Sequence, residues 1–363
     1  MTQRDLDLNL LKMYSFLVFS KLEGAVTSGM IHLGDRLGLY RSLSSFPHPV
    51  TSDELAASLQ LHSRWVQEWI HNQAAARLIE VTVDDQGIER YSMTPEAVVV
   101  LSDELHPAFG VGMFHRLPQT MQSLTVLPES FKTGIGLDYD SHGPEGAVGI
   151  ERSFEPWSRS YLLPVVLPAL DGAVQRLEAG ALVADIGCGA GGAAIRIAQA
   201  FPKASVTGYD ISQYALERAL EKKTIDSTSN VHFVDPRVTP LPENESLDIV
   251  TAFDCIHDMT HPQDVMQAIR RSLKPDGIWL LVDIKALDTF GENMAKNPMA
   301  SLMYGISVMS CMSSAMSVVG GAGLGTLGLP ESKARSMAAA AGFSRFRKLE
   351  IEHSLNAFYE VRP

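Results

Sequence analysis

The sequence has few cysteines, no long apolar run and a shortage of positive charge. Its 363 residues include only three cysteines, Cys188, Cys255 and Cys311, which lie far apart. This excludes a disulfide framework and a Cys-x-x-Cys metal site, so we expect three reduced thiols. No stretch approaches about 18 uninterrupted apolar residues, and the N-terminus lacks the basic start and compact apolar segment of a secretory signal. These absences predict a cytoplasmic protein that does not span a membrane.

The charge balance is acidic. The 42 Asp and Glu residues outnumber the 30 Lys and Arg residues, which gives a formal net charge of −12 at pH 7. Proteins bind phosphate backbones mainly through Lys and Arg, so this balance argues against a nucleic-acid partner. Small neutral or cationic ligands fit the composition better.

The length of the chain predicts two domains, and residues 1–150 form the first. Apolar residues recur at helical spacing over residues 8–43, and Thr51 with Glu54 makes a capping-box pattern at the start of a further helix. The stretch "IEVTVDDQGIERYSMT" then alternates apolar and polar residues around Asp84, Asp85 and Gly87, which predicts a hairpin. Helix, turn, helix and hairpin in this order are typical of a winged helix.

A winged helix suggests DNA binding, and its charges test that hypothesis. Residues 1–150 contain 10 Lys and Arg against 18 Asp and Glu, and the expected recognition helix offers only Arg64 and Arg77, beside Glu68. The first two helices also carry more apolar surface than a small wing domain can cover. We therefore favour a mainly α winged-helix domain that forms a homodimer and contributes to a substrate pocket.

Residues 151–363 change to short apolar strands that alternate with helices, the pattern of an α/β sheet. Pro164 and Pro168 are expected to bend a long helix that precedes the sheet. Seven strands are predicted, and no helix separates the last two: "ALVADI", "SVTGYD", "VHFVD", "LDIVTAFD", "GIWLLVDI", "FRKLEI" and "NAFYEVR".

The first of these strands leads into a glycine-rich loop, "DIGCGAGG", with glycines at 187, 189 and 191. Glycine there permits tight backbone angles and lets a ligand approach the free N–H groups at a helix start. Related glycine loops bind dinucleotides, but Asp185 would repel a pyrophosphate and attract an ammonium group. The loop therefore favours a cofactor that resembles an amino acid.

Two further acids end the next two strands. Asp210 follows the second strand in "GYDIS", where a carboxylate can accept both ribose hydroxyls, and Asp235 follows the third in "FVDPR", where it can accept from an exocyclic amine. Each alone has an alternative reading as a loop aspartate or helix cap. Three acids at successive strand ends, where α/β sheets bind ligands, favour a ligand site.

These motifs together resemble the ordered motifs of class I S-adenosylmethionine-dependent methyltransferases over residues 151–363. The resemblance implies a seven-stranded Rossmann-like sheet with its last strand antiparallel. It also implies S-adenosyl-L-methionine as cofactor, bound by Asp185, Gly187, Gly189, Gly191, Asp210, Ile211, Asp235, Pro236 and Phe253. The winged helix ahead of this domain is similar to the layout of small-molecule O-methyltransferases and related bacterial methyltransferases, in which the N-terminal domain forms the dimer.

The segment after the fourth strand, "DCIHDMTH", contains His257 and Asp258 in register with the "LHDW" motif of small-molecule O-methyltransferases, with Met259 in place of the Trp. In that family the histidine is the general base for a substrate hydroxyl, so the resemblance implies a catalytic His257. Asp283, at the end of the fifth strand, occupies the place of the family's glutamate partner. A cap or structural role for His257 stays open, because methyl transfer to amines or carboxylates can proceed by proximity alone.

A metal site is the weaker interpretation of the same octet. His257 and His261 are four residues apart, with Asp254 and Asp258 nearby. However, Pro262 indicates that the helix restarts after Thr260, which would separate the two rings. No metal is predicted.

An insertion at about 290–328 is the expected lid over the substrate. Five methionines, from Met299 to Met316, follow a helical stripe that suits an irregular apolar ligand and equally suits a core or interface helix. Tyr304, Cys311 and His353 are candidate pocket residues, as are Phe114 and His115 of the first domain. We expect methyl transfer to a small, largely apolar acceptor at a hydroxyl oxygen. Transfer to nitrogen, carbon or a carboxylate, and a non-catalytic cofactor-binding regulator, are the alternatives.

Overall fold

The computed structural model describes residues 6–363, which divide into two compact units at Pro118 and Gln119. The boundary predicted at about residue 150 differs from this division, because it falls inside helix α8 (Gly143–Trp157) of the second unit. That helix is tied to α11 (Gln213–Ile225) by ion pairs such as Arg218 Nε to Glu151 Oε2 at 2.7 Å. None of the helices in the described part of the chain has the length and apolar character needed to cross a bilayer.

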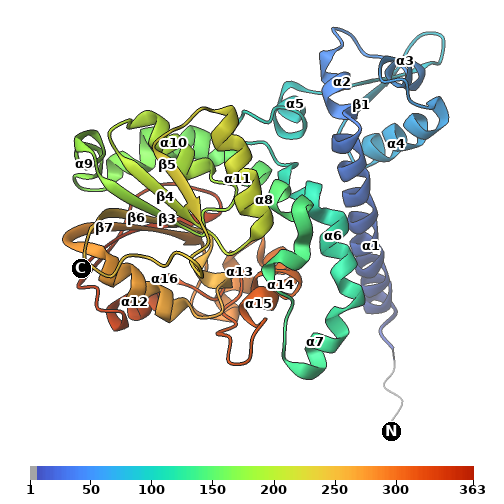
Figure 1. Ribbon diagram of the computed structural model, residues 1–363. Helices are drawn as coiled ribbons and strands as arrows, with labels where there is room; N and C mark the ends of the chain where they lie inside the picture. Colours follow the sequence, from blue (N-terminus) through green and yellow to red (C-terminus); the bar gives the residue numbers. More distant parts are fainter. Residues whose placement is uncertain (1–5) are drawn as a thin grey trace. The chain divides into compact units, whose positions relative to one another are not determined.

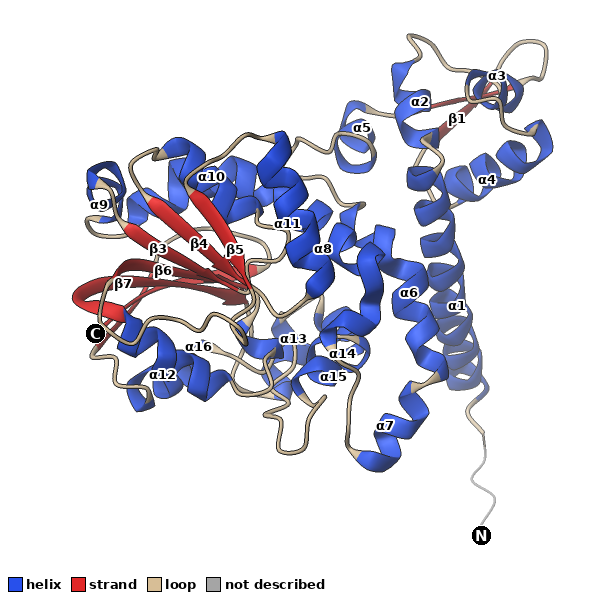
Figure 2. Ribbon diagram, in the orientation of Figure 1, coloured by secondary structure: helices blue, strands red, loops and turns tan. Residues whose placement is uncertain are grey.

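The first unit is a winged helix, as predicted. Helices α3 and α4 are followed by the antiparallel hairpin β1–β2, and Thr51 and Glu54 form the expected capping box on α3 (Figure 2). Its elements are α1 (Leu8–Arg36), α2 (Leu39–Ser45), α3 (Ser52–Ser58), α4 (Ser63–Ala75), β1 (Glu80–Val83), β2 (Glu89–Ser92), α5 (Pro95–Leu101) and η1 (Gly112–Arg116).

The core of this unit lies where α1 meets α4. Trp69 packs edge-on against Tyr40, with ring centroids 5.2 Å apart, and its Nε1 donates to the Met30 carbonyl oxygen at 2.9 Å. A Cβ at Gly34 would lie 2.5 Å from the Trp69 ring, so only glycine fits at this crossing. The N-terminal half of α1 makes no such packing and exposes a series of large apolar side chains.

The second unit is built on the seven-stranded sheet that the sequence predicts. The strand order is β5-β4-β3-β6-β7-β9-β8, with parallel pairing from β5 to β7 (Figure 1). Strand β9 is antiparallel to both of its neighbours, β7 and β8, which confirms the fold class. The strands are β3 (Leu182–Ile186), β4 (Ser205–Tyr209), β5 (Val231–Val234), β6 (Leu247–Phe253), β7 (Leu273–Ile284), β8 (Arg345–Lys348) and β9 (Asn356–Arg362).

Helices cover both faces of this sheet, which explains the nearly continuous apolar strands. One face packs against α9 and α10, and the other against α12 and α16 (Figure 2). The helices not yet given are α6 (Leu117–Gln122), α7 (Leu127–Thr133), α9 (Ala173–Ala179), α10 (Gly192–Ala200), α12 (Pro262–Ser272), α13 (Phe290–Lys296), α14 (Ala300–Met309), α15 (Cys311–Ala315) and α16 (Glu331–Ala340), with short turns η2 (Ser123–Thr125), η3 (Tyr139–His142) and η6 (Ile256–Asp258).

The long helix expected before the sheet changes its type of helix along its length. Helix α8 ends at Trp157 and continues as a π-helical segment, η4 (Ser158–Val166), and a short 3₁₀ turn, η5 (Leu167–Ala169). Pro164 and Pro168 lack backbone donors, so a regular α-helix cannot run through both positions.

Candidate functional site

The glycine loop between β3 and α10 leaves space above its backbone. Gly187, Gly189 and Gly191 have positive φ angles of 63°, 54° and 74°. A Cβ at Gly187 would lie 2.6 Å from the Cys255 Cβ, and one at Gly191 would lie 2.4 Å from the Phe233 ring. In the described part of the chain, and apart from its two chain neighbours, no atom lies within 4 Å of a Cβ built at Gly189, so the loop is tightly packed at Gly187 and Gly191 and open at Gly189. This is the arrangement that a ligand on bare backbone requires.

The Asp185 side chain is buried, and one of its two carboxylate oxygens lacks a hydrogen-bond partner among the described residues. Its side chain accepts from Thr251 Oγ1 at 2.6 Å through Oδ1, whereas Oδ2 has no hydrogen-bond partner in the described part of the chain. Burial raises the pKa of Asp185 to about 7, and the nearby charge of Asp210 adds to the effect. A cationic group such as the ammonium of an amino acid would satisfy the oxygen and reverse the shift. The residue therefore fits the methionine part of S-adenosylmethionine.

Asp210, at the end of β4, joins the glycine loop to the next helix. Its Oδ2 accepts from the Gly189 backbone N–H and its Oδ1 from the Ser212 backbone N–H, both at 2.8 Å. Each oxygen keeps a further lone pair, so two ribose hydroxyls fit this carboxylate. Burial raises its pKa. The adjacent Ile211 is about half exposed, as expected of a residue that a nucleoside would cover.

A second acid, Asp140, lies beside this position and was missed from the sequence. Ser212 Oγ donates to its Oδ1 at 2.5 Å, and the Gln213 backbone N–H donates to its Oδ2 at 3.1 Å. Asp140 belongs to η3, 72 residues before Ser212, so no local pattern signals the contact.

Asp235, at the end of β5, is paired with its own neighbour. Arg237 Nη2 lies 2.7 Å from Asp235 Oδ2 and also donates to the Ile211 carbonyl oxygen at 2.8 Å. The hydrogen bond from Arg237 lowers the pKa of Asp235, which stays ionised. The arginine fixes the Asp235–Pro236 turn beside Ile211, and an adenine amine would have to share the carboxylate with it.

His257 and Asp283 form a buried pair at the ends of β6 and β7. His257 Nδ1 lies 2.7 Å from Asp283 Oδ1, and the two side chains are 3% and 2% exposed. Burial alone would lower the pKa of His257, but the charge and hydrogen bond of Asp283 reverse the effect and raise it well above its usual value. The predicted partnership is therefore present in the geometry, with Nδ1 as the donor to the carboxylate.

The insertion predicted as a lid holds the turn that carries His257. The Gly325 backbone N–H donates to the His257 carbonyl oxygen at 3.1 Å, and Ser314 Oγ donates to the Asp258 carbonyl oxygen at 3.0 Å. The Ala322 backbone N–H donates to the Thr260 carbonyl oxygen at 2.8 Å. The position of the imidazole thus depends on α15 and on the segment that follows it.

The octet "DCIHDMTH" separates as the sequence indicates. Helix α12 begins at Pro262. The exposed His261 occupies its N-cap position and lies outside η6. A different group gathers at His257: a ring nitrogen, a carboxylate oxygen of Asp258 and the Cys311 sulfur lie within 4.8 Å of one another. His257 and Cys311, both predicted site residues, are therefore brought together.

The other predicted pocket residues make aromatic contacts of their own. Tyr304 on α14 packs against Phe290, with ring centroids 5.6 Å apart. His353 packs edge-on against Trp157 at 5.9 Å, and Phe253 contacts the same indole at 5.7 Å. Burial, and then the charge of Lys285, lower the pKa of His353.

Phe114 and His115 belong to η1 of the first unit. There the Phe114 carbonyl oxygen accepts from His32 Nδ1 at 2.8 Å. Their contribution to the substrate pocket stays a prediction.

Comparison with known proteins gives the same two parts. Residues 177–327 match the family model described as "Methyltransferase domain", and residues 25–103 match the "Rv2258c-like winged HTH domain". The chain joins a winged helix-turn-helix domain to a methyltransferase domain. This methyltransferase domain contains the glycine loop, Asp185, Asp210, Asp235 and the His257–Asp283 pair.

Sequence relatives of the methyltransferase domain are partial. The tRNA U34 carboxymethyltransferase of Pseudoalteromonas atlantica is 25% identical over 193 residues, which cover 49% of this chain and 59% of the relative. Two other matched relatives share only 30% and 46% of their length with the chain.

Solved structures match the whole chain in fold. Human N-acetylserotonin methyltransferase, in complex with S-adenosylmethionine, has a TM-score of 0.69 at 17% identity and covers 99% of both chains. The mitomycin 7-O-methyltransferase has a TM-score of 0.67 at 18% identity and covers 98% of this chain and 99% of its own. These similarities show a shared fold with S-adenosylmethionine-dependent methyltransferases.

Proposed function

We propose that the protein transfers a methyl group from S-adenosylmethionine to a hydroxyl oxygen of a small, largely apolar molecule. The observation that carries this proposal is the buried His257–Asp283 pair, 2.7 Å apart, at the same edge of the sheet as the glycine loop. An enzyme that methylates a hydroxyl needs a proton acceptor at this edge, whereas transfer by proximity alone does not.

In this proposal, the residues at the carboxyl ends of the parallel strands each bind a different part of the cofactor. Asp185 and the glycine loop bind the amino-acid part, Asp210 binds the ribose, and Asp235 meets the adenine amine, with Ile211, Pro236 and Phe253 alongside. When bound, S-adenosylmethionine supplies a methyl group activated on a sulfonium sulfur. The unpartnered oxygen of Asp185 supports this division because it is buried and has no hydrogen-bond partner among the described residues.

The imidazole of His257 accepts the proton of the acceptor hydroxyl. Asp283 accepts from Nδ1, so the lone pair that can take a proton is at Nε2, and the Cys311 thiol lies beside the ring. The same carboxylate stabilises the ring once it carries two protons. The hydroxyl oxygen can then attack the methyl carbon in line with the departing sulfur.

The acceptor class follows from the segment that holds His257. Helix α14 and its flanks present Met299, Leu302 and Tyr304 with substantial exposure, and Cys311 lies at the imidazole. Methionine and aromatic side chains suit an irregular apolar ligand. The solved structures of the same fold include enzymes named for N-acetylserotonin and mitomycin, which are small molecules, and this supports a small-molecule acceptor.

A methyl-transfer assay tests the acceptor atom. Protein is incubated with methyl-labelled S-adenosylmethionine and a panel of phenols and hydroxyquinones, each matched by its amine analogue. We expect label in the hydroxyl compounds only. Equal transfer to the amines would contradict the hydroxyl proposal and leave His257 without a role as a base.

The winged-helix unit is proposed to form a homodimer through α1. Its exposed apolar side chains include Leu10, Leu11, Tyr14, Phe16, Leu17, Val18, Phe19 and Leu22. A monomer seldom exposes so continuous an apolar surface. Light scattering should give twice the chain mass for the wild type and for the control Lys21→Glu, but a monomer for Phe16→Glu. A monomeric wild type would contradict the proposal of a homodimer.

The cytoplasmic location stays a prediction from the sequence.

A further inference from the structure

Asp254 occupies a strained backbone position immediately after β6. Its φ angle is 47°, in the left-handed region that non-glycine residues seldom adopt. Its backbone N–H donates to the Val282 carbonyl oxygen at 2.9 Å, and Phe253 is in register with Val282. The residue is therefore held next to Asp283, and strain of this kind persists where the surroundings over-determine a conformation.

A third strand reaches the same point. Asn356, the first residue of β9, pairs with Ile284 of β7, and its Nδ2 donates to Asp254 Oδ1 at 2.5 Å. The ends of β6, β7 and β9 thus place Asp254 and Asn356 around Asp283. This hydrogen bond fixes one oxygen of Asp254 and leaves the other for a different partner.

Asp283 has one satisfied oxygen and one unsatisfied oxygen. Oδ1 accepts from His257 Nδ1 at 2.7 Å and from the Ile284 backbone N–H at 2.8 Å. Oδ2 is buried and has no hydrogen-bond partner in the part of the chain that the structure describes. A buried carboxylate oxygen without a donor is costly, and a protonated carboxyl group is a donor.

The groups that face Asp254 act on its pKa in both directions, and together with burial their net effect favours the protonated form. They are Asp283 from β7 and His257 and Asp258 from η6, together with the uncharged Asn356 from β9. Burial, and then the charge of Asp283, raise the pKa of Asp254 to about 7, against the opposing effects of His257 and Asn356. Two adjacent carboxyl groups, of which Asp283 is buried and Asp254 partly buried, hold one proton more readily than two negative charges.

We propose that Asp254 is a positioning residue that directs a proton toward Oδ2 of Asp283 and so limits the negative charge that acts on His257. The charge of Asp283 raises the pKa of His257 well above its usual value, and an imidazole that already carries both protons cannot accept one from a substrate. A proton shared between Asp254 and Asp283 weakens that effect and lowers the pKa of His257. The inference rests on the proposed function only for the role of His257 as the base.

The test measures the titration of His257 itself. The full chain carries a carbon-13 label at the histidine Cε1 positions, and the His257 signal is assigned by its loss in His257→Gln. Spectra are recorded against pH with and without S-adenosylhomocysteine. Two variants separate the roles of the side chain: Asp254→Gly removes it and tolerates the positive φ, whereas Asp254→Asn keeps both an acceptor for Asn356 and a donor for Asp283. Asp226→Asn, at an exposed position, is the matched control.

We expect Asp254→Gly to raise the pKa of His257 by about one unit, a tenfold gain in proton affinity, whereas Asp254→Asn and Asp226→Asn leave it near the wild-type value. An unchanged pKa in Asp254→Gly would overturn the proposal, and so would an equal shift in Asp254→Asn. Because the readout needs no methyl transfer, it stays valid if the assigned activity fails.

Discussion

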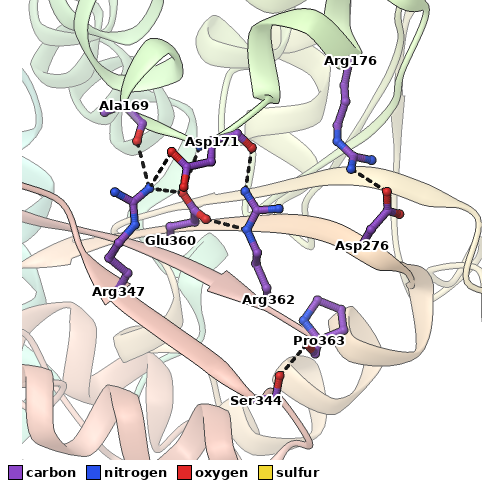
Figure 3. A network of polar contacts seen from close by, with 9 residues as sticks. All are labelled: Ala169, Asp171, Arg176, Asp276, Ser344, Arg347, Glu360, Arg362 and Pro363. Carbon is purple, nitrogen blue, oxygen red and sulfur yellow. Dashed lines mark hydrogen bonds and ion pairs between the residues drawn. The ribbon is translucent and has the colours of Figure 1, made fainter.

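Two regions of the methyltransferase sheet treat buried charge in opposite ways. Beside the outer strand β8, Glu360 of β9 is 5% exposed and accepts from Arg362 Nε and from Arg347 Nη2, each at 2.5 Å, and from the Asp171 backbone N–H at 3.1 Å (Figure 3). Burial alone would raise the pKa of Glu360, but these partners lower it. Near the carboxyl ends of the inner strands β3 and β6, Asp185 and Asp254 are held where burial raises the pKa of each to about 7.

The charged groups around Glu360 stabilise the fold, whereas Asp185 and Asp283 are charged groups that a ligand would complete. Around Glu360 the arginines also donate to the carbonyl oxygens of Ala169 and Asp171, so β8, β9 and the segment after η5 are joined by satisfied polar groups. Near the carboxyl ends of β3 and β7, Asp185 Oδ2 and Asp283 Oδ2 lack partners in the described residues. Unsatisfied buried acids beside the glycine loop indicate a site that a cationic cofactor and a substrate proton complete.

The largest predicted effect is at the imidazole. His257→Gln should lower kcat by about 10²- to 10⁴-fold, because the acceptor hydroxyl loses its base, while the melting temperature changes little. The exposed His261→Gln is the control and should keep the wild-type kcat. Near-normal turnover in His257→Gln would remove the base from the mechanism.

The next effect belongs to the hydrogen-bonded network around Glu360. Glu360→Gln should lower the free energy of unfolding by about 3 kcal/mol, because Arg362 is left buried without a counter-charge. The affinity for S-adenosylmethionine should not change. Urea unfolding and cofactor titration of the same samples measure both quantities. A loss of affinity at unchanged stability would reverse the comparison between the two regions.

Asp185→Asn should show the converse behaviour. We expect the affinity for S-adenosylmethionine to fall by about 10- to 100-fold, the range for a lost charge-assisted hydrogen bond, with unfolding free energy unchanged or raised. Stability can rise because a buried carboxylate is replaced by a neutral amide. If the variant binds normally and unfolds easily, Asp185 is a structural residue like Glu360.

The raised pKa of Asp185 predicts a pH dependence of binding. Below pH about 7 the carboxyl group is protonated and attracts an ammonium weakly; as pH rises through about 7 it becomes charged and affinity should increase. The increase should end near pH 8, where the amino group of the cofactor loses its own proton. Calorimetry in two buffers of different ionisation enthalpy should detect proton release. Affinity that falls from pH 6 to 7 would contradict this assignment.

The smallest predicted effect is that of a chelator. Cys311, Asp258 and His257 are close enough to suggest a metal site, but the hydrogen bond to Asp283 leaves His257 able to act as a base unaided. Treatment with a strong chelator should therefore change the methyl-transfer rate by less than about twofold. Loss of activity that zinc restores would favour a metal role for this group.

The sequence predicts the strands and the acids at their ends because both depend on local pattern. Each of the seven strands follows from its apolar run, and Asp185, Asp210 and Asp235 follow from their places next to strands. What it does not predict depends on distant partners: Asn356 lies 102 residues from Asp254, and Asp140 lies 72 residues from Ser212. The division between the units was misplaced for the same reason, since ion pairs across 67 residues tie α8 to α11.

Titration of the protein with S-adenosylmethionine tests the central claim most directly. We expect the wild type to bind, and Asp210→Ala to bind much more weakly at comparable thermal stability, because its carboxylate is assigned to the ribose hydroxyls. Absence of binding to the wild type at millimolar concentration would contradict the account of this sheet edge as a cofactor site.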